Sequence, residues 1–233
     1  WANSLFEDNA EFGYGMYLTY KNTQKRIRDI IAKSIDCVSK DVKELLNKWL
    51  ENETNYDITK KIVDKLQTME IPKDIKDILE YMVARSVFIV GGDGWAYDIG
   101  FGGIDHVLSS GENVNIIVLD TEVYSNTGGQ SSKSTRTGAV CKFASSGKET
   151  AKKDLAKMAL TYDHVYVGTI SLGANPNQAI KVLKEAEEYN GPSIVIAYAP
   201  CIAQGIIKGM KNSINEEKTA TEVGYFPLFH YNP

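Results

Sequence analysis

Two loops in the sequence carry residue types that could bind a phosphorylated ligand through a metal ion. The first is Gly91-Gly92-Asp93-Gly94-Trp95, which directly follows an apolar run and directly precedes a helical pattern. Glycines allow the backbone to approach a ligand closely, and the start of a helix favours a phosphate group. Asp93 would repel a bare diphosphate, but carboxylate and phosphate oxygens together suit Mg²⁺. The loop is therefore predicted to bind a diphosphate through a divalent cation.

The second loop follows the next predicted strand and reads Asp120-Thr121-Glu122-Val123-Tyr124-Ser125-Asn126-Thr127-Gly128-Gly129-Gln130. Loops at the carboxyl ends of neighbouring parallel strands lie side by side, and ligands bind there. The Thr121 hydroxyl and a backbone carbonyl of this loop could then complete the oxygen shell of the same Mg²⁺.

Two commoner phosphate-binding motifs do not fit the first loop. A dinucleotide-binding fingerprint would need a third glycine at the position of Tyr97, and it would place Asp93 against the pyrophosphate. A P-loop would need a Gly-Lys-Ser/Thr sequence, which does not follow.

The elements that must position these loops alternate along the chain. Near-continuous apolar runs predict strands at 86–90, 114–120, 164–169 and 193–198, and helical patterns lie between them at 96–109, 152–161 and 175–189. This alternation is typical of a parallel sheet covered on both faces. The predicted fold is a doubly wound, mostly parallel α/β sheet.

The rest of the chain is assigned to the same single domain, 1–233. Residues 1–19 are expected to be irregular, and about 21–85 to form a helical insertion, with a fourth helix opening at Pro72 and Cys37 in its core. The Ser/Thr/Gly-rich stretch at about 121–147 is a long loop of the kind that is either disordered or functional.

Composition narrows the class of protein. Charged residues make up 24 % of the chain, the formal net charge is −4, and hydrophobic residues make up 43 %, as in a soluble globular protein. The acidic balance argues against a nucleic-acid partner, and no apolar run approaches the roughly 20 residues that span a bilayer. Three scattered cysteines indicate free thiols, so we expect a cytoplasmic protein.

At the two loops the chain resembles thiamine-diphosphate enzymes, and specifically the pyruvate:ferredoxin (flavodoxin) oxidoreductase family. The general diphosphate motif often ends in Asn-Asn, and here Thr121 stands at the metal-ligand position instead. Further similar segments are Ala2–Gly13, Thr137–Val140 with Lys142–Ala144, and Tyr198-Ala199-Pro200-Cys201. The chain begins without a methionine, and we expect it to be part of a longer polypeptide.

The resemblance implies roles for individual residues. Asp93, the Thr121 side chain and the Val123 carbonyl would bind Mg²⁺, which would hold the diphosphate of thiamine diphosphate. The pocket would be shaped by Gly92, Gly94 and Trp95. Asn126 would reach the reactive ring and the substrate, as the catalytic residue. Cys201 would be one ligand of a [4Fe–4S] cluster whose other ligands lie outside this chain.

The implied activity is oxidative decarboxylation of pyruvate to acetyl-CoA. Coenzyme A would take the acetyl group, and [4Fe–4S] clusters would pass the electrons to ferredoxin or flavodoxin. The other domains of a full-length chain would be partners, in a homodimer, and the chain alone would be inactive. Two alternatives remain open: an oxidoreductase for a related 2-oxo acid, and a non-catalytic assembly module of the same fold.

Overall fold

The structure is a computed structural model, and it describes residues 9–204, 206 and 208–233. These residues form two compact units, one made of Gly15–Ser86 and one made of the other described residues. The first helix, α1 (Ala10–Ser34), belongs partly to each unit. The assignment of all 233 residues to a single domain stays a prediction.

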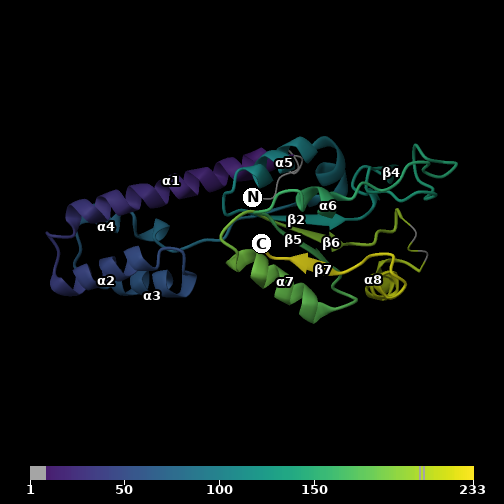
Figure 1. The fold of residues 1–233 in the computed structure, drawn as a ribbon. Helices are drawn as coiled ribbons and strands as arrows, with labels where there is room; N and C mark the ends of the chain where they lie inside the picture. Colours follow the sequence, from purple (N-terminus) through teal and green to yellow (C-terminus); the bar gives the residue numbers. More distant parts are fainter. Residues whose placement is uncertain (1–8, 205, 207) are drawn as a thin grey trace. The chain divides into compact units, whose positions relative to one another are not determined.

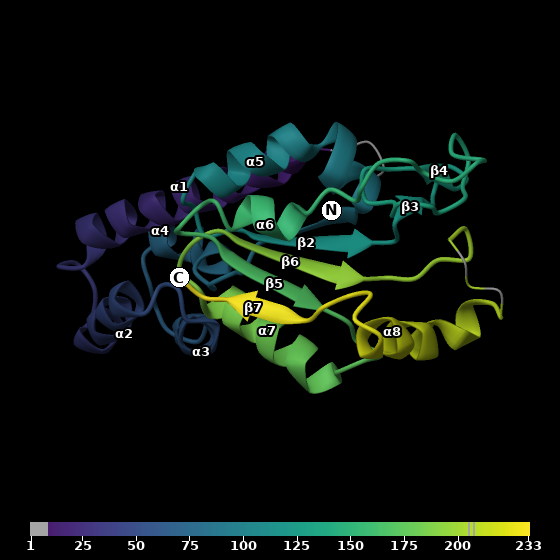
Figure 2. The same cartoon turned by 45° about the vertical axis from the view of Figure 1, so that its right-hand side comes forward.

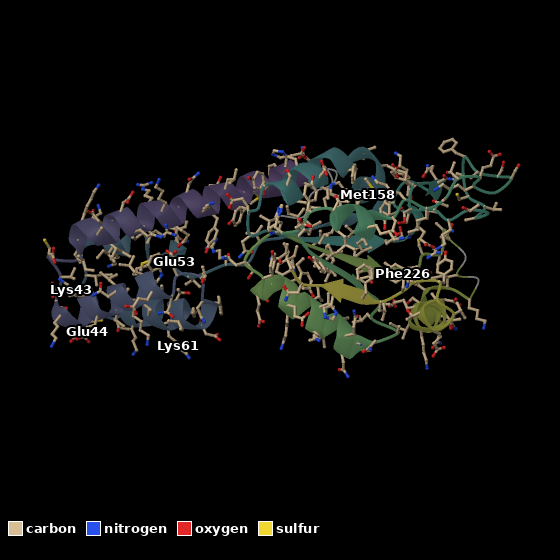
Figure 3. All side chains as sticks on the ribbon, viewed as in Figure 1. Lys43, Glu44, Glu53, Lys61, Met158 and Phe226 are labelled. Atoms are coloured by element: carbon tan, nitrogen blue, oxygen red, sulfur yellow. The ribbon has the colours of Figure 1, made fainter. Side chains whose placement is uncertain are left out.

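The Gly15–Ser86 unit is helical and has a hydrophobic core of its own. Trp49 is fully buried there, and its indole nitrogen donates to the Met82 carbonyl oxygen at 2.7 Å. Charged side chains such as Glu44 and Lys61 lie on the outside of the helices (Figure 3). Besides α1, the unit contains α2 (Lys40–Glu51), α3 (Tyr56–Leu66), α4 (Lys73–Lys76) and the 3-10 turn η1 (Leu79–Tyr81).

Two details of the helical unit differ from the prediction. The helix expected to open at Pro72 is a single short turn, α4, followed by η1. Cys37 is exposed rather than buried in the core. The reason is that α1 ends at Ser34, so Cys37 lies in the turn after the helix, while Ile35 and Val38 on either side of it pack against the core.

The other unit is built on a five-stranded sheet. Four parallel strands pair in the order β1 (Phe88–Gly92), β2 (Asn115–Asp120), β6 (Ser193–Tyr198) and β5 (Tyr166–Ile170). A fifth strand, β7 (Phe229–Tyr231), pairs antiparallel with β5 at the edge. The predicted mostly parallel α/β fold is confirmed, although β7 was not predicted, because a three-residue aromatic stretch carries no strand periodicity.

Helices cover both faces of this sheet. Figures 1 and 2 show α7 (Pro176–Glu188) on one face and α5 (Phe101–Ser109) with α6 (Leu155–Ala159) on the other. Ala179 and Val182 of α7 pack against Val195 of β6. The remaining elements are the short hairpin of β3 (Val123–Tyr124) and β4 (Gln130–Ser131), a 3-10 turn η3 (Met210–Asn212) and α8 (Ser213–Glu222). No helix in the described ranges is long and apolar enough to cross a membrane.

The segments on either side of the sheet also differ from expectation in two places. Ala10–Thr19 is helical, not irregular, and residues 1–8 lie outside the described part. The predicted helix at 96–109 is split into a π-helical segment, η2 (Gly94–Ile99), and α5. Gly100 lies where η2 meets α5, and a Cβ atom added there would lie 2.2 Å from the Trp95 ring.

Candidate functional site

The parallel pairing of β1 with β2 brings the two predicted loops together at the carboxyl ends of the strands. Gly92, the last residue of β1, is in register with Leu119 of β2. Thr121 Oγ1 consequently lies 2.7 Å from Asp93 Oδ1 and 2.9 Å from the Val123 carbonyl oxygen. The three oxygen ligands expected from the sequence therefore meet at one point.

A left-handed residue makes this convergence possible. Glu122, between Thr121 and Val123, has a φ of 63°. Such a conformation is costly for a residue with a side chain and persists only where the surroundings impose it. Here it allows the Thr121 hydroxyl to lie against both Asp93 Oδ1 and the Val123 carbonyl oxygen.

A cavity of about 280 Å³ opens at this point. Its lining includes every residue predicted to hold the cofactor, namely Gly92, Asp93, Gly94, Trp95, Thr121, Val123 and Asn126. A Cβ atom on Gly92 would meet nothing within 4 Å, whereas one on Gly94 would lie 2.3 Å from the Tyr124 ring. The structure thus brings these residues together, while their roles toward a ligand stay predictions.

Asp93 is a buried carboxylate whose side-chain hydrogen-bond partners are hydroxyl groups. It is 1 % exposed, with Thr121 at one oxygen and the Ser132 hydroxyl donating to Oδ2 at 2.6 Å. Burial raises the pKa of Asp93 to about 6. Among the described residues no Lys, Arg or His forms an ion pair with it. Its negative charge is therefore available for an external cation.

The two neighbouring buried carboxylates, Asp120 and Glu122, differ from Asp93 in that they form ion pairs. Lys152 Nζ lies 2.6 Å from Asp120 Oδ2 and 3.0 Å from Glu122 Oε1. Arg136 Nε lies 3.3 Å from the same Glu122 oxygen, and its guanidinium stacks over the Tyr225 ring. Asp120 and Glu122 are thus neutralised by protein cations, unlike Asp93.

The donor set at Asp93 fits a hard divalent cation. A carboxylate, a hydroxyl and a backbone carbonyl are all oxygen ligands, and Mg²⁺ binds such ligands while keeping positions for substrate phosphates. None of the described residues that line the cavity carries a thiolate or imidazole group, which would favour zinc or copper.

Cys201 lies apart from this cavity, after the end of β6. Its thiol is free, and its Sγ accepts from the Ala203 backbone nitrogen at 3.4 Å. In the described part of the chain no three His, Cys, Asp or Glu side chains gather to hold a metal. Cluster ligation by Cys201 stays a prediction.

Sequence reasoning missed the groups that support Asp93 and its neighbours. Ser132, Arg136 and Lys152 belong to or follow the long polar loop, and they reach carboxylates 14 to 39 residues away. No local pattern marks such contacts. The only available signal was the unusual length of the loop, which these bonds fix against the sheet.

Fold and site together define an α/β domain with an oxygen-lined cavity at the carboxyl ends of parallel strands. Residues 78–197 match the model of thiamine pyrophosphate enzymes, C-terminal TPP-binding domain, and the chain belongs to this family. The resemblance noted in the sequence is confirmed by similarity, over the whole of this chain, to part of pyruvate oxidoreductases.

The relatives are considerably longer than this chain. It is 51 % identical to the pyruvate:ferredoxin oxidoreductase of Moorella thermoacetica and 49 % identical to the pyruvate-flavodoxin oxidoreductase of Klebsiella pneumoniae. All of the chain is covered in both cases, but it spans only 21 % of each relative. A solved structure of 2-oxoglutarate:ferredoxin oxidoreductase from Magnetococcus marinus is also similar, at 25 % sequence identity and a TM-score of 0.48. The match covers 54 % of this chain and 43 % of the chain in that structure.

Proposed function

We propose that this chain binds thiamine diphosphate through Mg²⁺. Asp93, Thr121 and the Val123 carbonyl would bind the ion, and Gly92, Gly94 and Trp95 would line the diphosphate pocket. The observation that carries the proposal is the buried, unneutralised Asp93 carboxylate beside two further oxygen ligands. A buried charge of this kind is costly unless a cation compensates it.

The residues around the ion have distinct tasks in this proposal. The bound cofactor would supply the electron sink that decarboxylation of a 2-oxo acid requires. Asn126 lines the same cavity as Asp93 and would contact the reactive ring and the substrate, as the catalytic residue. The backbone at Gly92 leaves open space next to the ion site, into which the diphosphate would fit.

The activity that we propose for the natural polypeptide carrying this chain is pyruvate:ferredoxin (flavodoxin) oxidoreductase. Pyruvate would be oxidatively decarboxylated to acetyl-CoA, and electrons would leave through [4Fe–4S] clusters, one of them ligated by Cys201. Support comes from the names of relatives that are 43–51 % identical over the whole chain. We further propose a cytoplasmic homodimer in which other domains complete the site, so that the isolated chain is inactive.

Calorimetric titration of thiamine diphosphate tests the proposed function. The natural polypeptide should bind it in the presence of Mg²⁺ and lose the binding in EDTA, because the diphosphate reaches Asp93 only through the metal. Equal binding in Mg²⁺ and in EDTA, or no binding by the natural polypeptide, would contradict the proposal.

A further inference from the structure

We infer that Ser132 is a positioning residue for the Mg²⁺ site, and this inference rests on the proposed function. Ser132 follows β4 and is 4 % exposed. Its Oγ lies 2.6 Å from Asp93 Oδ2, whereas Thr121 contacts the other carboxylate oxygen, Oδ1. Ser132 would therefore fix the orientation of the carboxylate while Oδ1 is turned toward Thr121 and the ion.

The direction of this hydrogen bond follows from the donors available. A serine hydroxyl carries one hydrogen and two lone pairs. The Ser134 backbone nitrogen donates to Ser132 Oγ at 3.0 Å and so occupies a lone pair. The single hydroxyl hydrogen is left for Asp93, and an ionised carboxylate can only accept.

Ser132 itself is held rigidly. Its backbone nitrogen donates to Thr135 Oγ1 at 2.8 Å, and its carbonyl oxygen accepts from Lys148 Nζ at 2.9 Å. Further along, the Ser134 hydroxyl donates to Asp120, whose carboxylate is bound by Lys152. The hydroxyl is thus fixed on a buried network before any metal arrives, which is how an outer group orients a metal ligand.

The chemical type of the donor matters as well as its place. At Asp120 and Glu122, lysine and arginine supply the hydrogen bonds and cancel the charge. At Asp93 the corresponding place is taken by a neutral hydroxyl. Ser132 can therefore orient the carboxylate without competing with a dication for its negative charge.

Metal affinity measured in the natural polypeptide tests the inference. Mg²⁺ is titrated calorimetrically in the presence of a fixed excess of thiamine diphosphate for the wild type, Ser132→Ala and Ser132→Thr. Removing an outer partner of a metal ligand typically lowers affinity about 10- to 100-fold, which is the loss expected for Ser132→Ala. The threonine variant keeps the hydroxyl and should recover most of the affinity.

Ser193→Ala is the matched control. Ser193 is also fully buried, and its hydroxyl donates to Asn115 Oδ1 at 2.7 Å, between β6 and β2. It should lose stability as Ser132→Ala does but keep wild-type Mg²⁺ affinity. If Ser132→Ala binds Mg²⁺ like Ser193→Ala while the wild type binds normally, the positioning role is refuted. Absence of Mg²⁺ binding by the wild type would instead overturn the proposed function, and the inference with it.

Discussion

In the absence of Mg²⁺, the Asp93→Asn variant should be more stable toward unfolding than the wild type at pH 8. The same variant should lose the Mg²⁺-dependent binding of thiamine diphosphate. Burial raises the pKa of Asp93 from 3.8 to about 6. The native state therefore retains a proton that the unfolded chain releases, so stability falls as the pH rises from about 4 to 6. Above pH 6 the carboxyl is ionised in both states, and the loss of folding stability caused by burying its charge is fully present. At about 1.36 kcal/mol per unit of pKa shift, this loss amounts to about 3 kcal/mol.

Urea denaturation in EDTA checks this expectation. The advantage of Asp93→Asn should be about 1–3 kcal/mol at pH 8 and should disappear near pH 4, where the wild-type carboxyl is protonated. Asp98→Asn is the matched control, because Asp98 is a nearby carboxylate that already has Lys133 at 2.9 Å. A wild type as stable as Asp93→Asn at pH 8, or a variant that keeps Mg²⁺-dependent cofactor binding, would refute the idea that Asp93 is reserved for a cation.

Lys152→Met should lower the free energy of unfolding by about 3–5 kcal/mol. The ammonium group is the shared partner of Asp120 and Glu122, whose side chains are at most 2 % exposed. Removing one partner of a buried ion pair leaves an uncompensated charge, which here is that of Asp120, whereas Glu122 keeps Arg136 as a partner. Methionine keeps the apolar stem of the side chain, so the loss reports the charge and not the packing.

A second lysine of the same segment gives the control for Lys152. Lys157 pairs with Asp154 at 2.9 Å, but its side chain is 81 % exposed. Surface pairs of this kind contribute about 0–1 kcal/mol, so Lys157→Met should be nearly neutral. Equal effects of the two substitutions in urea denaturation would show that the Lys152 network does not hold the loop against the sheet.

The strands and the two loops at their ends could be predicted from the sequence because the signal for each is local. Apolar runs mark strands that are buried on both faces, and β6 was predicted with the bounds that it has in the structure, Ser193–Tyr198. The meeting of Asp93 with Thr121 followed from the rule that parallel neighbours end at the same edge.

Features that depend on tertiary contact could not be predicted. Gly13 and Gly15 suggested an irregular segment, but Gly13 lies within α1, where an added Cβ atom would be 2.7 Å from the Ile89 side chain. The close packing of the Trp95 ring on Gly100, where η2 meets α5, is likewise a tertiary contact. Lys152 and Asp120 form an ion pair although they lie far apart in the chain. No sequence pattern around either residue predicts this pair.

The central claim is that three oxygens of two loops bind the ion that holds the cofactor. Mn²⁺ prefers the same oxygen ligands as Mg²⁺ and can be located in a crystal by its anomalous scattering. In crystals grown with thiamine diphosphate and Mn²⁺, we predict a peak about 2.0–2.3 Å from an Asp93 carboxylate oxygen, Thr121 Oγ1 and the Val123 carbonyl oxygen. A cofactor seen in the cavity without a peak at these three atoms would contradict the account.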